Sequence, residues 1–275
     1  MTVSTNRFLT KDAIRFGGVI QLTLEEKAKS TRRELIKFKT NSGFGHLASS
    51  LSVVDILVSL FYDEKTWFKH ESDHLIWGKA HGGPAVYPIL ADLGYFPKSE
   101  LEKYCKIGGI LRLHPDKSIP GCNFVGGSLG NALGFAAGLA FGNQLGRFVV
   151  ILGDAELYEG AIWESLILIN HYHLNNLLII VDRNGLGILG ETEELLKLEP
   201  LATKFRGFGF NVLVEDGHNF IKLRACLSKL PNEPTVLIAN TIKSKGVEFM
   251  EGKPEYHTII PRDPSEIKKM IEGLQ

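Results

Sequence analysis

The sequence predicts a doubly wound α/β fold, in which a mostly parallel sheet carries helices on both faces. Residues 148–152 and 177–181 are apolar runs rich in β-branched side chains, and they lack the alternation of a half-exposed strand. Between these runs, apolar residues recur at helical intervals of three and four: Ile162, Trp163, Leu166 and Ile169. Strand and helix patterns keep alternating further along the chain, which is typical of a parallel sheet.

Several further elements are expected before residue 148. Residues 22–40 predict a charged helix whose buried stripe holds Ala28, Leu35 and Ile36, and residues 41–50 predict a loop of small residues. The remaining expectations are a helix over 53–60, a short strand ending at Trp77, and a helix over 132–141.

The elements after residue 181 complete the alternation. They are expected as a helix over 201–208, a strand over 211–214, a helix over 219–230, a strand over 235–240 and a short capped helix over 264–275. We expect one domain over residues 1–275, with residues 1–20 as a possible N-terminal arm.

Charge and cysteine usage narrow the functional class. The chain has 31 basic and 31 acidic residues that are interspersed, so no charged patch favours nucleic acid or an anionic membrane. No apolar run approaches the roughly 18 residues of a membrane span, and we expect a soluble cytoplasmic protein. Cys105, Cys122 and Cys226 are far apart and unpaired in spacing, which favours three buried thiols over disulfides or structural zinc.

Two polar residues follow the two central strands. Asp154 comes after the first strand and Asn184 after the second. Because ligands bind at the carboxyl ends of parallel strands, we expect the two side chains to face one crevice. A carboxylate and an amide oxygen there suit Mg²⁺, with diphosphate oxygens, a carbonyl and water completing the shell. The alternative is that Asp154 only caps the helix that follows.

Histidines and glycines gather in the loops that precede these strands. His46, His81 and His114 each lie in a loop, and a glycine cluster at 126–130 opens a helix whose backbone can approach a ligand closely. Lys243 and His257 follow the last strand, where a cation meets an anion readily. A single histidine is more often structural than functional, so their shared location matters more than any one of them.

Taken together, these segments resemble the thiamine-binding half of transketolase. The similar segments, in order, are 42–46 with 49–50, 79–81, 114–115, 127–130, 153–156, 159–160, 182–185, 243–246 and 256–257. Residues 153–184 are similar to the family's Gly-Asp-Gly-x₂₆-Asn-Asn motif. They depart from it at two positions, with Ala155 in place of the second glycine and Arg183 in place of the first asparagine. The resemblance implies thiamine diphosphate with Mg²⁺, or with Ca²⁺ or Mn²⁺, as cofactors.

The resemblance also implies roles for single residues. Asp154, Asn184 and the backbone carbonyl of Leu186 would hold the metal. The cofactor would be bound by His81, Gly127, Leu129, Gly153, Ala155, Glu156, Asn184, Lys243 and His257. The residues implied to act in catalysis are His46, His81, His114, His257 and Glu159.

The chain looks like the N-terminal subunit of a split transketolase, which transfers a two-carbon ketol unit between sugars or sugar phosphates. The resemblance implies a second, C-terminal subunit that supplies a pyrimidine-binding domain and its glutamate, in a heterotetramer of two copies of each. Glu159 would lie near that glutamate across the interface, although an ordinary exposed helix residue is the alternative.

Other interpretations remain open. The segment 42–52 departs from the family's usual Ser-Gly-His-Pro and leans towards 1-deoxyxylulose-5-phosphate synthase, so pyruvate-type thiamine chemistry is the second hypothesis. Ala155 suggests a third, a cofactor-binding half without turnover, because a methyl group there fits only if φ is negative and the side chain clears the diphosphate.

Overall fold

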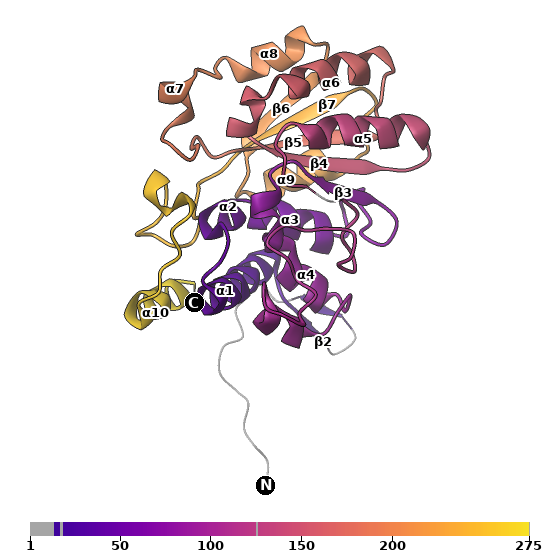
Figure 1. Cartoon of the computed structure of the whole chain (residues 1–275). Coiled ribbons are helices and arrows are strands. Elements are labelled where there is room, and N and C mark those ends of the chain that lie inside the picture. Colours follow the sequence, from indigo (N-terminus) through magenta and orange to yellow (C-terminus); the bar gives the residue numbers. More distant parts are fainter. Residues whose placement is uncertain (1–13, 17–18, 125, 275) are drawn as a thin grey trace.

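The computed structural model describes residues 14–16, 19–124 and 126–274. Its centre is a five-stranded, entirely parallel sheet in the order β3-β4-β5-β7-β6 (Figure 1). The strands are β3 (His74–Trp77), β4 (Phe148–Gly153), β5 (Leu177–Arg183), β6 (Asn211–Asp216) and β7 (Thr235–Asn240). The predicted fold class and all five strands are therefore confirmed.

Helices cover both faces of the sheet (Figure 1). Above it, in the view of Figure 1, lie α5 (Asn131–Gly142), α6 (Gly160–His171) and α8 (Leu201–Gly207), and below it lie α1 (Leu24–Ser42), α2 (Leu47–Ser52), α3 (Val54–Tyr62), α4 (Tyr87–Asp92) and α9 (Phe220–Leu227). Two short helices complete the chain, α7 (Thr192–Leu195) beside the β5 exit and α10 (Pro264–Glu272) against α1. The 3₁₀ turns are η1 (Ala80–Val86), η2 (Lys98–Lys103), η3 (Ala155–Tyr158) and η4 (Pro254–His257).

The two helix layers explain why the strands do not alternate. In β4, Val149 and Ile151 pack into the core below the sheet, while Val150 and Leu152 pack into the core above it. All four side chains are fully buried. A strand with apolar contacts on both faces gains from apolar residues at every position.

The N-terminal half of the fold is fixed by the long helix α1. Thr23 and Glu26 form a capping box at its start, and Gly43 ends it with φ +71°, a conformation that favours glycine. The expected loop 41–50 is wrong in its second half, because α2 begins at Leu47. Leu47 and Leu51, one turn apart, are both fully buried in the core, and this burial stabilises a helix that the small neighbouring residues do not predict.

The N-terminal arm is described only in part. Within residues 1–20, strand β1 (Ile14–Phe16) and the start of strand β2 (Val19–Gln21) pair antiparallel, and the other expected arm residues lie outside the described ones. None of the helices in residues 14–16, 19–124 and 126–274 combines the length and apolar character needed to cross a bilayer.

The expectation of three buried thiols is correct for one cysteine only. Cys122 is buried, whereas Cys105 and Cys226 are half-buried. Cys105 follows η2 in a left-handed conformation (φ +56°), and Cys226 lies near the end of α9, so neither side chain is fully enclosed by the core.

Candidate functional site

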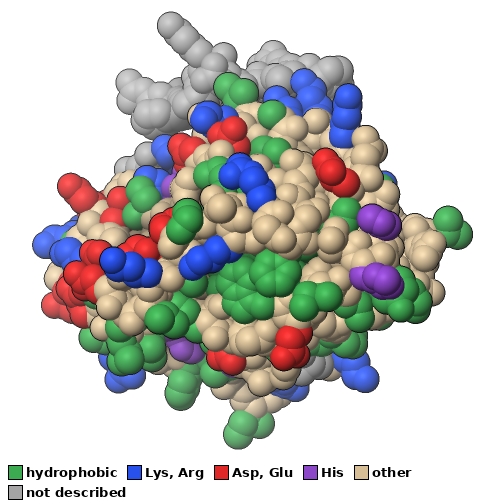
Figure 2. Space-filling view, turned by 90° about the horizontal axis from the view of Figure 1, so that it is seen from above, with side chains coloured by type: hydrophobic (Ala, Val, Ile, Leu, Met, Phe, Trp, Pro, Cys, Tyr) green, Lys and Arg blue, Asp and Glu red, His purple; other side chains and the backbone are tan. Residues whose placement is uncertain are grey.

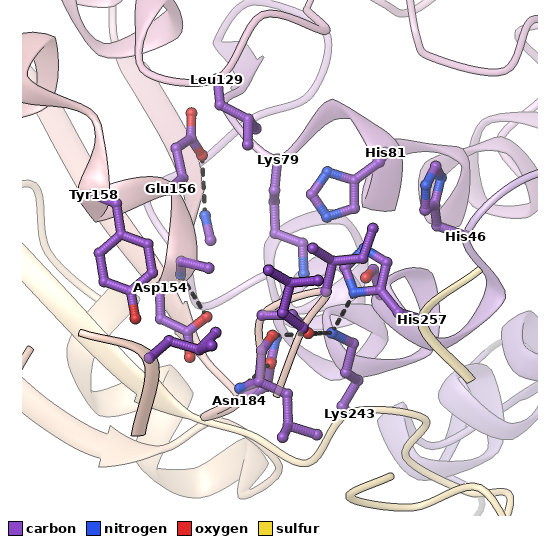
Figure 3. Close-up of a pocket in the computed structure, with 18 of the residues that line it drawn as sticks. His46, Lys79, His81, Leu129, Asp154, Glu156, Tyr158, Asn184, Lys243 and His257 are labelled. Carbon is purple, nitrogen blue, oxygen red and sulfur yellow. Dashed lines mark hydrogen bonds between the residues drawn. The ribbon is translucent and has the colours of Figure 1, made fainter. Parts of the chain in front are cut away.

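A cavity of about 650 Å³ opens at the carboxyl ends of β3, β4, β5 and β7 (Figure 3). Almost every site residue expected from the sequence lines it: His46, His81, His114, Gly127, Leu129, Gly153, Asp154, Ala155, Glu156, Asn184, Leu186, Lys243 and His257. Segments from eight separate parts of the chain therefore converge on one site. Glu159 is the exception and does not line the cavity.

Asp154 and Asn184 face this cavity together, as the strand arrangement predicts (Figure 3). Asp154 is buried and accepts hydrogen bonds from the backbone N–H of Ala155 (2.8 Å) and Gly185 (2.6 Å). It therefore does cap the following turn, but it also joins the two loops at which β4 and β5 end. Burial, and then the nearby Asp182, raise the pKa of the Asp154 carboxyl, and the hydrogen bonds and the Arg183 guanidinium offset this only in part.

The Asn184 amide is held in a fixed orientation. Its Nδ2 donates to Asp182 Oδ2 (3.1 Å), and its Oδ1 accepts from the backbone N–H of Leu186 (3.1 Å). The second lone pair of that oxygen is left for another partner. One carboxylate, one amide oxygen and the carbonyl of Leu186 form a set of hard oxygen donors, and such a set fits Mg²⁺ better than a soft metal.

Lys243 brings a cation to the same place. Its Nζ donates to the carbonyls of Leu186 (2.9 Å) and Gly187 (3.3 Å) and contacts Nδ1 of His257 (2.7 Å). Burial, and then Lys79, lower the pKa of Lys243 to about 8. A buried lysine beside carbonyls and a carboxylate is placed to bind the oxygens of an anionic ligand such as a diphosphate.

Glu156 fastens the glycine cluster to the sheet. Its Oε1 accepts from the N–H of Gly130 (3.0 Å) and its Oε2 from the N–H of Gly153 (3.1 Å), while burial raises its pKa to about 7. Gly127 (φ +142°) and Gly130 (φ +86°) adopt conformations that favour glycine. Glu156 thereby places the backbone of the 127–130 loop at the cavity wall.

Ala155 fits its position without backbone strain. Among the described non-glycine residues only Cys105, His173 and Ser244 have positive φ. Ala155 therefore has the negative φ that an alanine needs at this position of the motif. Its methyl group lies on the cavity wall, facing Gly187.

Three histidines pack as a cluster at one end of the cavity (Figure 3). The ring of His46 lies 5.2 Å from that of His81 and 5.5 Å from that of His257, and the latter two rings are 5.8 Å apart. His114 lines the same wall. The pKa of each of these four histidines is lowered, and burial is the largest cause in every case. The pKa falls to about 4 for His46 and His257. Neutral imidazoles both donate and accept protons, so this wall suits proton transfer to and from sugar oxygens.

Glu159 lies outside the cavity, at the exposed start of α6. A Cβ added at Gly130 would meet its side chain at 2.6 Å, so the Glu159 stem packs against the glycine cluster. Its carboxylate is accessible from outside this chain.

The sequence reasoning missed an ion pair beneath the cavity. Lys79 Nζ contacts Asp182 Oδ2, and both side chains are at most 1% exposed. Asp182 also accepts from Ser52 Oγ (2.7 Å) and from Thr241 Oγ1. The sequence did contain a signal for this pair, because Asp182 directly follows a fully apolar run. A buried charge at that place is costly unless it has a partner of opposite charge.

Arg183 was also missed as a site residue, although it departs from the motif. Its guanidinium donates to Asp154 (3.2 Å), Thr192 (2.6 Å) and Glu193 (2.8 Å). The side chain therefore links the candidate metal carboxylate to α7. The cavity also has an apolar wall that no motif indicates, made of Tyr158, Ile188, Leu189, Leu195 and Leu196.

The chain matches one family model, described as the thiamine diphosphate binding domain of transketolase, over residues 25–273. It is similar to an apulose-4-phosphate transketolase subunit from Actinobacillus succinogenes, with 37% identity over 92% of this chain and 96% of that protein. It is also similar to the 6-deoxy-6-sulfo-D-fructose transketolase subunit of a Clostridium species, with 34% identity over 87% of this chain and 92% of that protein.

A solved structure of a transketolase has a similar fold. The structure from Campylobacter jejuni matches with a TM-score of 0.81 and 26% identity, covering 91% of this chain and 42% of that one. This chain therefore spans less than half of the solved transketolase chain, while it matches nearly the whole length of the two subunit relatives.

Proposed function

The chain belongs to the transketolase family, and on that basis we propose that it is the thiamine diphosphate-binding subunit of a split transketolase. As a single domain it would act with a separate subunit to move a two-carbon ketol unit from a ketose to an aldose. The observation that carries this proposal is the cavity itself, which brings hard oxygen donors, a buried lysine and four neutral histidines to one place.

Asp154, Asn184 and the carbonyl of Leu186 would hold Mg²⁺, and the raised pKa of buried Asp154 supports a need for a cation. The diphosphate would be bound by Lys243, His81 and the backbone at Gly127 and Leu129. The positive charge of Lys243 and the N–H groups of a glycine loop both favour an anionic ligand. The remaining cofactor contacts assigned to this wall are Gly153, Ala155, Glu156 and His257. Thiamine diphosphate, when bound, supplies the electron sink for the reaction.

The histidines act on the sugar. His46, His81, His114 and His257 would hydrogen-bond to substrate hydroxyl and carbonyl oxygens, and as neutral rings they can pass protons to and from those oxygens. The apolar wall of Leu189, Leu195 and Leu196 would exclude water from the same space.

The partner subunit is supported by an exposed apolar face on α5 and α6. Hydrophobic side chains gather on the side of the molecule seen from above in Figure 2. On these two helices the exposed ones include Phe135, Leu139, Phe141, Ile167 and Leu168. Patches of this kind mark protein interfaces. Glu159 begins α6 beside this face, where a glutamate of a pyrimidine-binding subunit would meet it, and two copies of each subunit would form a heterotetramer.

The names of the relatives suggest the class of donor. One is named for a ketose phosphate and the other for a sulfo sugar, both of which carry an anionic group. We propose that the donor of this enzyme is likewise a ketose with a phosphate or sulfonate group.

The test uses the full chain co-purified with the product of the neighbouring reading frame. Incubation with ketose phosphates, a 6-sulfo ketose and pyruvate as donors, and with an aldose acceptor, should give Mg²⁺-dependent ketol transfer from a ketose only. Turnover of pyruvate alone would favour deoxyxylulose phosphate synthase-like chemistry instead. Binding of thiamine diphosphate without turnover of any donor would favour a non-catalytic half, and full activity of the isolated chain would contradict the split-subunit assignment.

A further inference from the structure

Three buried polar atoms behind the cavity wall have no hydrogen-bond partner among the described residues. They are Nζ of Lys39, the hydroxyl oxygen of Tyr104 and Nδ1 of His46. Lys39 and Tyr104 are fully buried, and neither lines the cavity. Because an unpaired buried polar group is costly, three such atoms in one region indicate a shared arrangement.

The atoms of Lys39 and Tyr104 border the same spot beneath Gly45. A Cβ built on Gly45 would lie 2.7 Å from the Tyr104 hydroxyl and 3.0 Å from Lys39 Nζ. Gly45 also has φ +100°, so the backbone conformation and the crowding both require glycine. His46 is the next residue in the chain, and its ring lines the cavity.

Lys39 has no acidic partner of its own. No carboxylate of the described residues lies within ion-pair distance of Nζ, and the nearest aromatic ring, that of Tyr104, has its centroid 5.8 Å away. Burial lowers the pKa of Lys39 to about 7, and the Cys105 thiol opposes this only in part. The Cys105 thiol also helps to raise the pKa of Tyr104. The thiol and the Tyr104 hydroxyl do not, however, have the geometry of a hydrogen bond.

The charge of Lys39 reaches two cavity histidines. After burial, Lys39 is the next largest cause that lowers the pKa of both His46 and His114. The other charged or titratable groups that face His46 all line the cavity: His114, Lys243, Lys79, His81 and His257. Lys39 is thus a cation that acts on this wall from outside the cavity.

Hydrogen-bond chemistry gives the order in which the three groups connect. A lysine ammonium only donates, a tyrosine hydroxyl both donates and accepts, and a ring nitrogen without a proton accepts. With Lys39 charged, bridging water molecules in the order Lys39 to Tyr104 to His46 would give each of the three atoms a partner.

We propose that Lys39 and Tyr104 are positioning residues that hold His46 as a neutral ring with its proton on Nε2. Resting on the proposed function, this makes His46 a hydrogen-bond donor to substrate oxygens in the cavity. Below pH 7 the arrangement keeps a cation close to the cavity without exposing it to water or to the substrate.

The test is ¹⁵N NMR of the full chain labelled at histidine, with the His46 signals assigned from a His46→Gln variant. We expect a neutral ring with the proton on Nε2 between pH 5.5 and 6.5, where Lys39 is charged. Tyr104→Phe should shift the ring towards a mixture of tautomers, because the donor to Nδ1 is lost. Lys39→Met should raise the pKa of His46 by at least about half a unit.

Activity of the complex with the partner subunit gives a second readout. In Lys39→Met the acidic limb of the kcat/KM profile should move to higher pH, because His46 becomes protonated earlier. Lys37→Met is the matched control, since Lys37 lies on the same helix, is 55% exposed and pairs with Glu34. It should change neither the His46 signals nor the profile.

Unchanged His46 signals in both Lys39→Met and Tyr104→Phe would overturn the proposal. If Lys39→Met does not fold, Tyr104→Phe decides alone, because it removes a single oxygen. The NMR result does not depend on turnover, so expected shifts without ketol transfer would contradict the proposed function and leave this inference standing.

Discussion

Asn184 Nδ2 donates a 3.1 Å hydrogen bond to Asp182 Oδ2, and the same carboxylate oxygen contacts the buried ammonium of Lys79. The orientation of the candidate metal ligand therefore depends on an ion pair beneath the cavity. Asp182 is fully buried, and although burial alone would raise its pKa, Lys79 and the hydrogen-bonded side chains of Thr241 and Ser52 hold that pKa below the usual value.

Asp182→Asn should lower the free energy of unfolding by roughly 3–5 kcal/mol, because the variant leaves the Lys79 charge buried without a partner. Chemical denaturation at pH 7 measures this. Lys79→Met should be similarly harmful, and the double variant should lose less than the sum of the two. The exposed pair Lys222–Glu215 provides the control, where Lys222→Met should cost less than about 1 kcal/mol. Additive losses in the double variant would argue against the coupling.

Asp154→Asn should abolish Mg²⁺-dependent binding of thiamine diphosphate, because it removes the charged member of the donor set. Calorimetric titration of the reconstituted complex with the cofactor and Mg²⁺ gives the affinity. Without ligands, the variant should have a Tm at pH 8 equal to or above that of the wild type, because burial makes the ionised carboxylate unfavourable. Wild-type affinity in this variant would remove Asp154 from the metal site.

His114→Ala and His257→Ala should each lower kcat by about 10²–10⁴-fold while changing cofactor affinity much less, since their proposed partners are sugar oxygens. Steady-state kinetics and cofactor titration on the same preparations separate the two effects. His171→Ala is the control, because His171 is exposed at the end of α6. Unaltered kcat in either cavity variant would mean that the histidine has a structural role only.

Glu159→Gln should weaken binding of the partner subunit, with lower activity as the result, but it should not impair metal binding by the isolated chain. Sedimentation or light scattering of the mixed subunits reports the fraction of heterotetramer. Glu164→Gln tests the same helix at another exposed carboxylate and should leave assembly intact. Normal assembly and rate in Glu159→Gln would identify Glu159 as an ordinary surface residue.

Asp55 should control stability in acid. Burial would raise its pKa, but Arg32, whose guanidinium binds it through two hydrogen bonds of 2.9 and 2.6 Å, together with His218 lowers it below the usual value. This contribution is present above the unfolded-state pKa and is lost as the pH falls towards the lower folded-state value. Asp55→Asn should therefore lower the unfolding free energy by roughly 3–5 kcal/mol at pH 7 and by less at about pH 2.5, which is below the usual pKa of an aspartate. An equal loss at both pH values would contradict the charge-based explanation.

The sheet and most of the cavity could be predicted because they depend on local pattern and topology. Apolar runs mark β4 and β5, and parallel pairing then brings Asp154 and Asn184 to one edge whatever the details of packing. The histidine roles and the cofactor contacts came from resemblance, and they stay predictions until the variants above are measured.

What could not be predicted depends on contacts between distant residues. The Lys79–Asp182 pair and the Lys39–Tyr104 arrangement join segments with no shared periodicity, so no sequence pattern announces them. The start of α2 at Leu47 was missed for a related reason, because its burial against other elements outweighs the small, loop-like residues around it.

The His218 ring links α3 to the loop that follows β7. Its Nδ1 contacts Asp55 (2.6 Å) on α3, and its Nε2 accepts from the backbone N–H of Ile242 (2.8 Å), next to Lys243. The loop that carries Lys243 is thus tied to the helices below the sheet. Substitutions at Arg32, Asp55 and His218 should accordingly covary among related proteins, because a change at one position alone would displace a cavity lysine that none of the three touches.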